Sequence, residues 1–323
     1  MSGNLKHIVI LTGGPSAERS IALASAKFVA QHLDPIKYTS KTILLEPHGW
    51  IEQETGQPVD LNDFSLKEGL DKVHFDFVFL IIHGTPAEDG KIQGYFEARR
   101  IPHSTCDTLT SALTFNKQWC KDFLKNFSVP MAWSTVIASE DMEDIDVQVF
   151  QYPVFVKPNN NGSSYGVSRV NTSDQMRAAL QNAAQYDHEI IIESFIEGRE
   201  FSCGVVREGK QVHVFPITEI IPKNEFFDYQ AKYEGASQEV TPAHLDAQLT
   251  IMCQEQSRRI YQVLKCRGLV RCDYILKDGT FYLLEVNTIP GLSPASIVPQ
   301  QARAYGWSME HMLDVVIQDC MAH

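Results

Sequence analysis

The sequence predicts an α/β protein built from more than one domain. An apolar stretch, a glycine-containing turn and a helical pattern follow one another between His7 and Phe28, which is the opening of an α/β unit. A second apolar run, Phe75 to Ile82, is broken only by Asp76 and is typical of a buried parallel strand. The chain has 323 residues, enough for about two or three domains of the usual ~100–200 residues.

The composition argues against two classes of partner. The formal net charge is −12 and no basic run occurs, whereas proteins that bind nucleic acid need clustered lysine and arginine. No stretch reaches the ~20 apolar residues of a membrane helix, and we find no signal peptide. The seven cysteines are scattered without a C-x-x-C pair. We therefore expect reduced thiols, a cytoplasmic location, and no nucleic-acid or membrane partner.

The first two predicted strands each end beside an ionisable residue. Glu18 lies in the turn before a helix in which Ile21, Ala24 and Phe28 recur at helical spacing, and His83 follows the second strand. Open α/β sheets bind ligands at the carboxyl ends of their strands, so the two residues predict a shared crevice in which Glu18 binds a substrate ammonium. Alternatively, Glu18 only complements the helix dipole and His83 is structural.

The middle of the chain predicts helices and a phosphate-binding loop. We expect helices over residues 93–100 and 108–127, an exposed connection over 138–149, and a strand that ends at Lys157. The small residues after Lys157, from Gly162 onward, let backbone N–H groups approach an anion, although a bare hairpin is the alternative. A lysine that leaves an apolar strand needs a partner, which favours the phosphate loop.

Three further segments complete the predicted elements before the last hairpin. Residues 189–206 read as strand, turn and strand, which suits either a purine site or plain sheet. Residues 222–242 lack a clear period but are aromatic, and we expect them to form a substrate lid because long ordered loops are usually functional. Helices are predicted over residues 245–264 and 308–321.

A hairpin near the C-terminus carries the strongest chemical signal. Two apolar runs flank Asp278-Gly279, a typical tight turn. Side chains two apart on a strand share a face, so Arg271 aligns with Asp273, and Glu285 aligns with Asn287. Oxygen ligands without His or Cys suit Mg²⁺ that holds phosphates, and the arginine suits an oxyanion. The alternative is an edge hairpin with a polar, solvated face.

These segments together resemble D-alanine–D-alanine ligase, a member of the ATP-grasp superfamily. The resemblance runs nearly end to end and depends on the order of its blocks more than on any single one. The blocks are Gly13-Gly14-Pro-Ser-Ala-Glu18, His83-Gly84, Glu88-Asp-Gly90, Phe155-Val-Lys157-Pro, Gly162-Ser163-Ser164, Phe195-Ile-Glu-Gly-Arg-Glu200, Phe226-Phe-Asp-Tyr-Gln-Ala-Lys232-Tyr233, Arg271-Cys-Asp273 and Glu285-Val-Asn287-Thr-Ile-Pro-Gly291.

The resemblance implies a three-domain ATP-grasp fold and an ATP-dependent ligase. The implied units are residues 1–104 with the first amino-acid site, 105–193 with the phosphate loop, and 194–323 with the lid, metal site and second amino-acid site; ATP lies between the last two. The implied reaction joins two D-alanines through an acyl phosphate for peptidoglycan precursor synthesis, in a cytoplasmic homodimer. ADP and phosphate are the other products.

The resemblance also assigns roles to individual residues. Those implied in catalysis are Glu18, Ser163, Tyr233 and Arg271. Those implied in binding ATP are Lys117, Lys157, Glu193, Ser194, Phe195, Ile196, Glu200, Phe226 and Lys232. Those implied in binding the amino acids are Glu18, His83, Arg271, Gly291, Ser296 and Ile297. Two Mg²⁺ ions, with Mn²⁺ as a substitute, are expected at Asp273, Glu285 and Asn287.

Two other functions stay open at the level of sequence. The residues after Glu18, Ser20-Ile21-Ala22, differ from the Glu-Val-Ser of many family members, which allows a related carboxylate–amine ligase with another amino-acid pair. A nucleotide-binding protein without catalysis is the third hypothesis, but it has no need of Arg271 as an oxyanion group. A dinucleotide oxidoreductase fits poorly because no G-x-G-x-x-G occurs.

Overall fold

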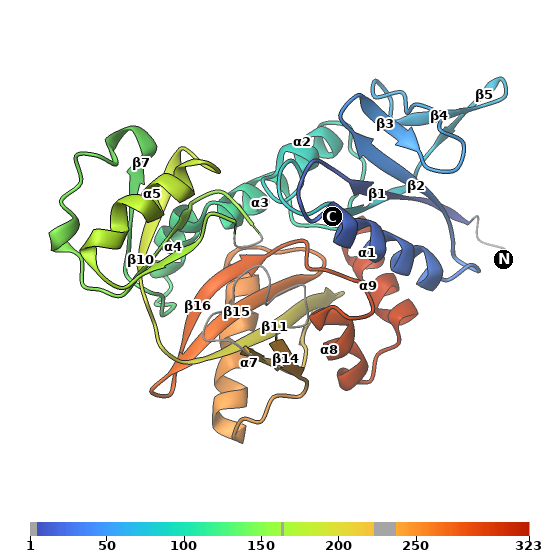
Figure 1. The fold of residues 1–323 in the computed structure, drawn as a ribbon. Coiled ribbons are helices and arrows are strands. Elements are labelled where there is room, and N and C mark those ends of the chain that lie inside the picture. The colour runs from blue at the N-terminus through green and yellow to red at the C-terminus, as the bar shows by residue number, and fades with distance from the viewer. Residues whose placement is uncertain (1–4, 163–164, 223–236, 323) are drawn as a thin grey trace.

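The computed structural model describes residues 5–162, 165–222 and 237–322. Its main architecture is three β-sheets with helices packed on them, and the three sheets lie in three lobes around a common centre (Figure 1). The helix α9, Met309–Met321, lies beside α1, Arg19–His32, so the end of the chain packs against its beginning. Because helices pack on all three of these sheets, the predicted α/β class is correct.

The first sheet has the strand order β3-β2-β1-β6, with β1 parallel to both of its neighbours. Its strands are β1 Lys6–Gly13, β2 Tyr38–Glu46, β3 Gly49–Glu52 and β6 Phe77–Ile81, and a separate hairpin is formed by β4 Ser65–Glu68 and β5 Asp71–His74. Ile8 and Ile10 share a core cluster with α1 and α9, whereas Val9 and Leu11 share one with α2, Lys91–Ala98. Both faces are covered, which explains the unbroken apolar runs.

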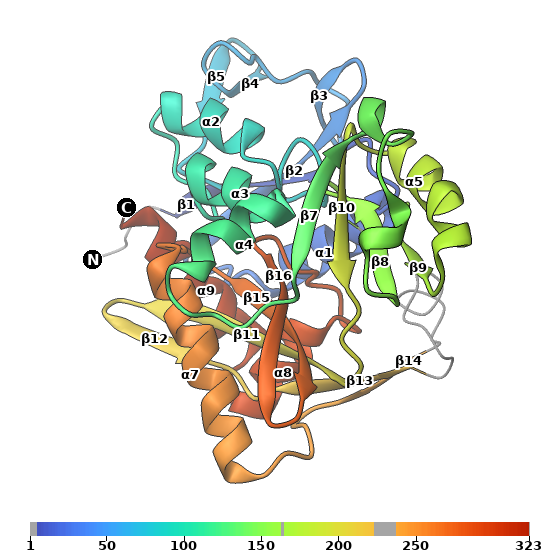
Figure 2. The same ribbon diagram turned by 90° about the vertical axis from the view of Figure 1, so that its left-hand side faces the viewer.

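The second sheet, of order β7-β10-β8-β9, is antiparallel throughout its described pairs. Its strands are β7 Ser134–Ala138, β8 Val154–Pro158, β9 Ser168–Val170 and β10 Glu189–Ser194, and α5 Met176–Ala184 packs on one face. Short 3-10 turns flank it at Ser139–Asp141, Val147–Val149 and Ser173–Gln175. In Figure 2 this sheet stands apart from the third sheet, with β10 leading down toward it.

The third sheet carries the C-terminal hairpin in its order β14-β13-β11-β15-β16, with β12 paired to β11. Its strands are β11 Arg199–Glu208, β12 Gln211–Val214, β13 Thr218–Pro222, β14 Ser237–Val240, β15 Val270–Lys277 and β16 Thr280–Asn287. The helix α7, Ala247–Val263, covers one face with a core that includes Tyr261 and Tyr274. The helices α8, Ile297–Tyr305, and α9 lie against β11.

The structure corrects several details of the predicted elements. The single helix expected over residues 108–127 is two helices, α3 Thr108–Phe115 and α4 Lys117–Lys125, because Asn116 has an extended backbone and accepts a hydrogen bond from the Trp119 amide as the cap of α4. The helix after Glu18 is present, but its buried face is offset, and Ala24 is exposed.

The segment 189–206 contains the two predicted strands, whereas the expected lid needs correction. The strands β10 and β11 belong to different sheets, so this segment carries the chain from the second sheet to the third. Within residues 222–242, the part from Ser237 to Val240 is the strand β14 and not loop. Residues 223–236, where the rest of the predicted lid falls, lie outside the described residues.

Candidate active site

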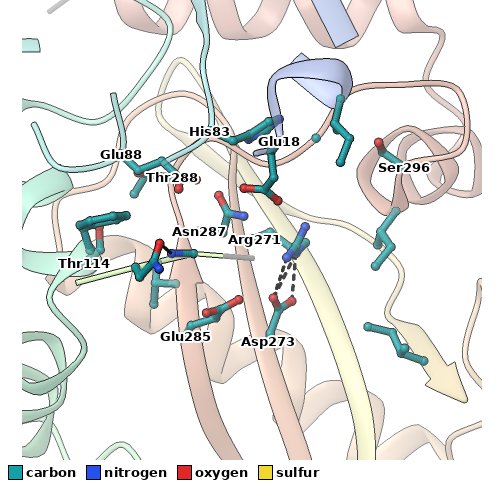
Figure 3. A pocket seen from close by; sticks show the side chains of 18 of the residues that line it. Glu18, His83, Glu88, Thr114, Arg271, Asp273, Glu285, Asn287, Thr288 and Ser296 are labelled. Atoms are coloured by element: carbon teal, nitrogen blue, oxygen red, sulfur yellow. Dashed lines mark hydrogen bonds and ion pairs between the residues drawn. The ribbon is translucent and has the colours of Figure 1, made fainter. Parts of the chain in front are cut away.

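A cavity of about 370 Å³ is lined by residues from all three sheets and their loops. Figure 3 shows Glu18 and His83 on one side of it, facing Arg271, Asp273, Glu285 and Asn287 on the other. The predicted site residues that line it are Glu18, His83, Lys117, Glu200, Arg271, Asp273, Glu285, Asn287, Gly291, Ser296 and Ile297. The fold thus gathers segments that are far apart in the sequence.

The hairpin of β15 and β16 supplies the acidic side of the cavity. Its turn has positive φ at both Asp278 (48°) and Gly279 (75°), as a tight two-residue turn requires. The resulting register places Arg271 opposite Asn287, and Asp273 opposite Glu285. The predicted convergence of these side chains on one face is therefore correct.

Arg271 and Asp273 form a nearly buried ion pair at this surface. The guanidinium Nη2 donates to Asp273 Oδ2 at 2.7 Å and Nε donates to Oδ1 at 3.0 Å. Ser202 Oγ donates a further hydrogen bond to Asp273 Oδ1 at 2.7 Å. These bonds fix the carboxylate and guanidinium in place beside the cavity.

The same surface offers an oxygen-only set of possible metal ligands. Asp273 and Glu285 contribute carboxylates, and Asn287 contributes a side-chain amide. The Asn287 Oδ1 also accepts a hydrogen bond from the backbone N–H of Ile289 at 2.9 Å. Among the described residues, no group of three or more His, Cys, Asp or Glu could hold a metal ion. Two carboxylates and one amide oxygen nevertheless suit a hard cation that takes its remaining ligands from water and phosphate.

Glu18 and His83 lie at the strand ends where the sequence places them. Glu18 precedes α1 but makes no side-chain capping hydrogen bond, so helix capping does not explain its buried carboxylate. His83 follows β6, and burial lowers the pKa of its imidazole although the nearby Glu18 charge opposes that effect. The two residues share the crevice, as predicted.

Glu88 is a cavity residue to which the sequence analysis gave no role. Its carboxylate accepts a hydrogen bond from the Gly84 amide at 2.9 Å. Burial raises the pKa of Glu88 to about 8, and the Glu18 charge adds to the rise. The signal in the sequence was its position in a glycine-flanked loop directly after the second strand, the usual place for ligand-binding residues.

Lys117 enters the cavity from the first turn of α4. Its ammonium donates to the carbonyl oxygen of Asn161 in the loop after β8. Burial lowers the pKa of Lys117 to about 8, and the charge of Lys157 contributes to the same direction. A buried ammonium of this kind gains from an anionic partner such as a phosphate.

A polar network joins the segments that carry the two lysines. Asn116 Nδ2, just before Lys117, donates to Asn160 Oδ1 at 2.8 Å and to Glu189 Oε2 at 3.2 Å. Asn159 Nδ2 donates to the same Glu189 oxygen at 2.8 Å. The start of α4 and the loop after Lys157 are therefore held at a fixed separation.

The residues predicted to meet adenine are not among those that line the cavity. Ser194 and Phe195 use their amides in hydrogen bonds to the carbonyls of Trp133 (2.9 Å) and Pro153 (3.2 Å). The Phe195 ring lies 4.2 Å from the guanidinium carbon of Arg169. The predicted site residues that are described but do not line the cavity are Lys157, Glu193, Ser194, Phe195 and Ile196.

Four predicted site residues cannot be placed. Ser163, Phe226, Lys232 and Tyr233 lie outside the described residues, so their roles stay predictions. Across the described part of the chain, no helix combines the length and apolar character needed to cross a membrane. All seven cysteines are buried and free of disulfide bonds.

Solved structures define the class to which this architecture belongs. D-alanyl-alanine synthetase A from Vibrio cholerae superposes with a TM-score of 0.90 at 27% identity and covers 100% of both chains. The VanG D-Ala:D-Ser ligase from Enterococcus faecalis gives 0.88 at 30% identity over 98% of this chain and 99% of that one. A Bacillus anthracis D-alanine–D-alanine ligase complexed with ATP gives 0.80 at 30% identity over 99% and 98%. The chain has the ATP-grasp fold of these ligases.

Sequence comparisons narrow the class to one family. The families described as D-ala D-ala ligase N-terminus and C-terminus match residues 7–106 and 123–318. The D-alanine–D-alanine ligase of Flavobacterium johnsoniae is 43% identical over 323 residues, covering 98% of this chain and 100% of that protein. That of Parabacteroides distasonis is 43% identical over 321 residues, 97% of each. The chain belongs to the D-alanine–D-alanine ligase family.

Proposed function

We propose that this chain joins two D-alanines into D-alanyl-D-alanine and converts ATP to ADP and phosphate. One observation carries the proposal: the cavity sets the buried carboxylate of Glu18 opposite an arginine and three oxygen-bearing side chains, with Lys117 at its edge. A carboxylate on one side suits an amino-acid ammonium, and the opposite side suits phosphates and an oxyanion. The curated relatives named D-alanine–D-alanine ligase support the same reaction.

The nucleotide lies between the second and third sheets in this proposal. Lys117 and Lys157 bind its phosphates, which supply the anionic partners that two enclosed ammonium groups favour. Residues 193–196 bind the adenine and Glu200 binds the ribose. Support comes from the position of Glu200 in the cavity wall and from the ion pair between Glu193 and Lys157.

The reaction proceeds in two transfers. The carboxylate oxygen of the first D-alanine, whose ammonium is held by Glu18, attacks the γ-phosphorus of ATP, and the bond to ADP breaks. The amine of the second D-alanine, seated near Ser296 and Ile297, then attacks the carbonyl carbon of the acyl phosphate. Arg271 and the backbone at Gly291 stabilise the oxyanion that forms, and phosphate leaves as the peptide bond closes.

Asp273, Glu285 and Asn287 would hold two Mg²⁺ ions, because their oxygens match what this cation prefers. The bound metal would neutralise phosphate charge, the main requirement of phosphoryl transfer. The hydrogen bonds from Arg271 and Ser202 to Asp273 support this assignment, since they fix the carboxylate in place at the cavity wall.

Several broader features form part of the proposal. The units 1–104, 105–193 and 194–323 each contain one of the three main sheets, which supports them as domains. A homodimer and a role in peptidoglycan precursor synthesis follow from the family alone. Size-exclusion chromatography with light scattering tests the dimer directly.

The activity is tested by phosphate release from ATP and Mg²⁺ with single amino acids and then with pairs. We expect release that depends on D-alanine, with D-alanyl-D-alanine identified by mass spectrometry. Phosphate release that requires D-serine or D-lactate instead would change the proposed second substrate but leave the proposed reaction type unchanged. No release with any pair, despite measurable ATP binding, would contradict the proposal.

A matched pair of variants separates the site from general stability. Asp273 and Asp319 are both buried, and each is paired with an arginine at 2.7 Å, but Asp319 does not line the cavity. We expect Asp273→Asn to lower kcat by at least about 10²-fold. Asp319→Asn should leave kcat of the folded protein within about twofold, whatever its effect on stability.

A further inference from the structure

A buried carboxylate beside the cavity is shared by two lysines. Lys121 Nζ contacts Glu193 Oε1, and Lys157 Nζ contacts Glu193 Oε2. The exposed fractions of these side chains are only 10%, 15% and 9% for Lys121, Lys157 and Glu193. Burial alone would raise the pKa of Glu193, but the two ammonium groups outweigh it and lower that pKa to about 2. The cluster therefore holds one negative and two positive charges.

The two lysines stand in different positions relative to the cavity. Lys157 is the next-to-last residue of β8, and the loop that follows lines the cavity through Asn161 and Gly162. Lys121 projects from the buried face of α4, one turn beyond Lys117. Neither lysine lines the cavity itself, but the chain that follows Lys157 reaches the cavity wall within four residues, at Asn161.

The helix that carries Lys121 is fixed to the second sheet. The Gln118 amide donates to Asn159 Oδ1 at 3.0 Å, and Ser134 Oγ donates to Gln118 Oε1 at 2.9 Å. These bonds tie α4 to β7 and to the end of β8. Lys121 consequently has a stationary backbone from which to hold Glu193.

We propose that Lys121 is a positioning residue, the permanent counterion of Glu193 that frees Lys157 to bind a nucleotide phosphate. The inference rests on the proposed ATP-dependent function. Removing one partner from a buried ion pair is strongly unfavourable, so a lone Lys157–Glu193 pair would keep Lys157 away from the phosphate. With Lys121 in place, Glu193 stays paired when Lys157 moves.

The charge balance of the cluster agrees with this role. Two ammonium groups around one carboxylate leave a net charge of +1 in a poorly solvated region, and a phosphate oxygen that draws Lys157 toward it neutralises that excess. The i,i+4 spacing of Lys117 and Lys121 puts both on one side of α4, so a single helix serves the phosphate and the counterion.

The test is a double-variant cycle read out by ATP affinity. The variants are Lys121→Met, Glu193→Gln and the two combined, with Lys121→Arg as the conservative replacement and the exposed Lys125→Met of the same helix as control. Binding of a non-hydrolysable ATP analogue with Mg²⁺ is measured by calorimetry. KM for ATP and for D-alanine and the Tm are measured alongside.

We expect Lys121→Met to weaken ATP binding by roughly 10- to 100-fold, because Lys157 is then the only lysine among the described residues that pairs with Glu193. KM for D-alanine should change by less than about threefold. Adding Lys121→Met to Glu193→Gln should change ATP affinity by less than about threefold, since no carboxylate is left to hold Lys157. Lys121→Arg and Lys125→Met should bind ATP as the parent does.

Two results would overturn the inference. One is ATP affinity within twofold of the parent in folded Lys121→Met; the other is an equal loss with and without Glu193→Gln, which indicates a merely structural lysine. If Lys121→Met does not fold, Lys121→Gln takes its place in the cycle, because it also removes the positive charge while its amide can hydrogen-bond the buried carboxylate. Parent protein that binds the analogue but forms no ADP with D-alanine refutes the proposed function alone, since the binding cycle remains measurable.

Discussion

Replacing Arg271 with alanine should lower both the stability of the protein and its kcat, for two different physical reasons. The substitution removes the guanidinium that binds Asp273 at 2.7 Å and 3.0 Å, and leaves that carboxylate with Ser202 as its remaining described side-chain donor. The same guanidinium faces the cavity, where we assign it to the oxyanion. Stability and chemistry can therefore be measured on one variant.

The size of the stability effect follows from burial. The Arg271 and Asp273 side chains are 15% and 7% exposed, and breaking such a pair by removing one partner costs about 3–5 kcal/mol. Because the Ser202 hydrogen bond remains, we expect about 3 kcal/mol. At roughly 2 °C for each kcal/mol in a chain of this size, Tm should fall by about 6 °C.

The size of the kinetic effect follows from the assigned role. Removing one donor to a tetrahedral oxyanion typically lowers kcat by ~10²–10³-fold. That range corresponds to about 3–4 kcal/mol of the barrier. Turnover is measured by coupling ADP release to a spectrophotometric assay at saturating ATP and D-alanine, well below the Tm of the variant.

Lys91→Ala is the matched control for the stability measurement. Lys91 and Asp89 are also two residues apart, and their ion pair is 2.6 Å long, but the lysine is 68% exposed. An exposed pair contributes no more than about 1 kcal/mol, so Tm should change by less than about 2 °C. The two variants differ mainly in the solvent exposure of the broken pair.

The stability effect and the kinetic effect of Arg271→Ala can each be contradicted separately. A Tm loss for Arg271→Ala as small as that of Lys91→Ala would refute the energetic argument from burial. An unchanged kcat in the folded variant would remove Arg271 from the mechanism. A loss of kcat that Arg271→Lys fully restores would show that a positive charge suffices, and that the planar geometry of the guanidinium is dispensable.

Three further perturbations have defined outcomes. Glu88 keeps its proton in the folded protein up to pH about 8, so the free energy of unfolding should fall as pH rises from about 4.5 to 8. We expect this fall to be about 1–2 kcal/mol, because the side chain keeps some solvent contact, and Glu88→Gln should remove it. Urea titrations at several pH values measure both proteins. Asn116→Ala removes the cap of α4 and should lower the free energy of unfolding by about 1–2 kcal/mol. It should also raise KM for ATP, because Lys117 is the next residue. The cap variant Asp246→Ala of α7 should lower stability without changing KM for ATP. Gly90→Ala puts a Cβ 2.5 Å from a backbone carbonyl oxygen at φ 84° and should cost about 3 kcal/mol by thermal unfolding; a Tm within 1 °C of the parent would contradict it.

Local patterns in the sequence predicted the strands and the hairpin that carry the residues on the two sides of the cavity. The apolar runs of β1 and β6 indicate strands buried on both faces, and the fold covers both. The Asp278-Gly279 turn and the alternation of side chains predict that the polar residues of the hairpin share one face. These features depend on neighbours a few residues away, so the sequence alone could specify them.

The break between α3 and α4 shows where local patterns mislead. The apolar spacing over residues 108–127 runs on through Asn116, but the side chain of that residue caps a new helix and bonds to Asn160 and Glu189. The stabilisation that selects the break comes from a loop and a strand distant in sequence. Helical periodicity contains no information about such partners.

The sequence by itself determined the α/β class, the hairpin with its oxygen-bearing side chains and arginine, and the strand-end positions of Glu18 and His83. Only the tertiary structure decided that these groups face one cavity, that the pKa of Glu88 rises to about 8, and that Lys121 pairs with Glu193. The physical reason is how far apart in the sequence the interacting residues lie. Turns and strand faces are fixed by adjacent residues, whereas desolvation and ion pairing depend on which distant segments the fold packs around each charge.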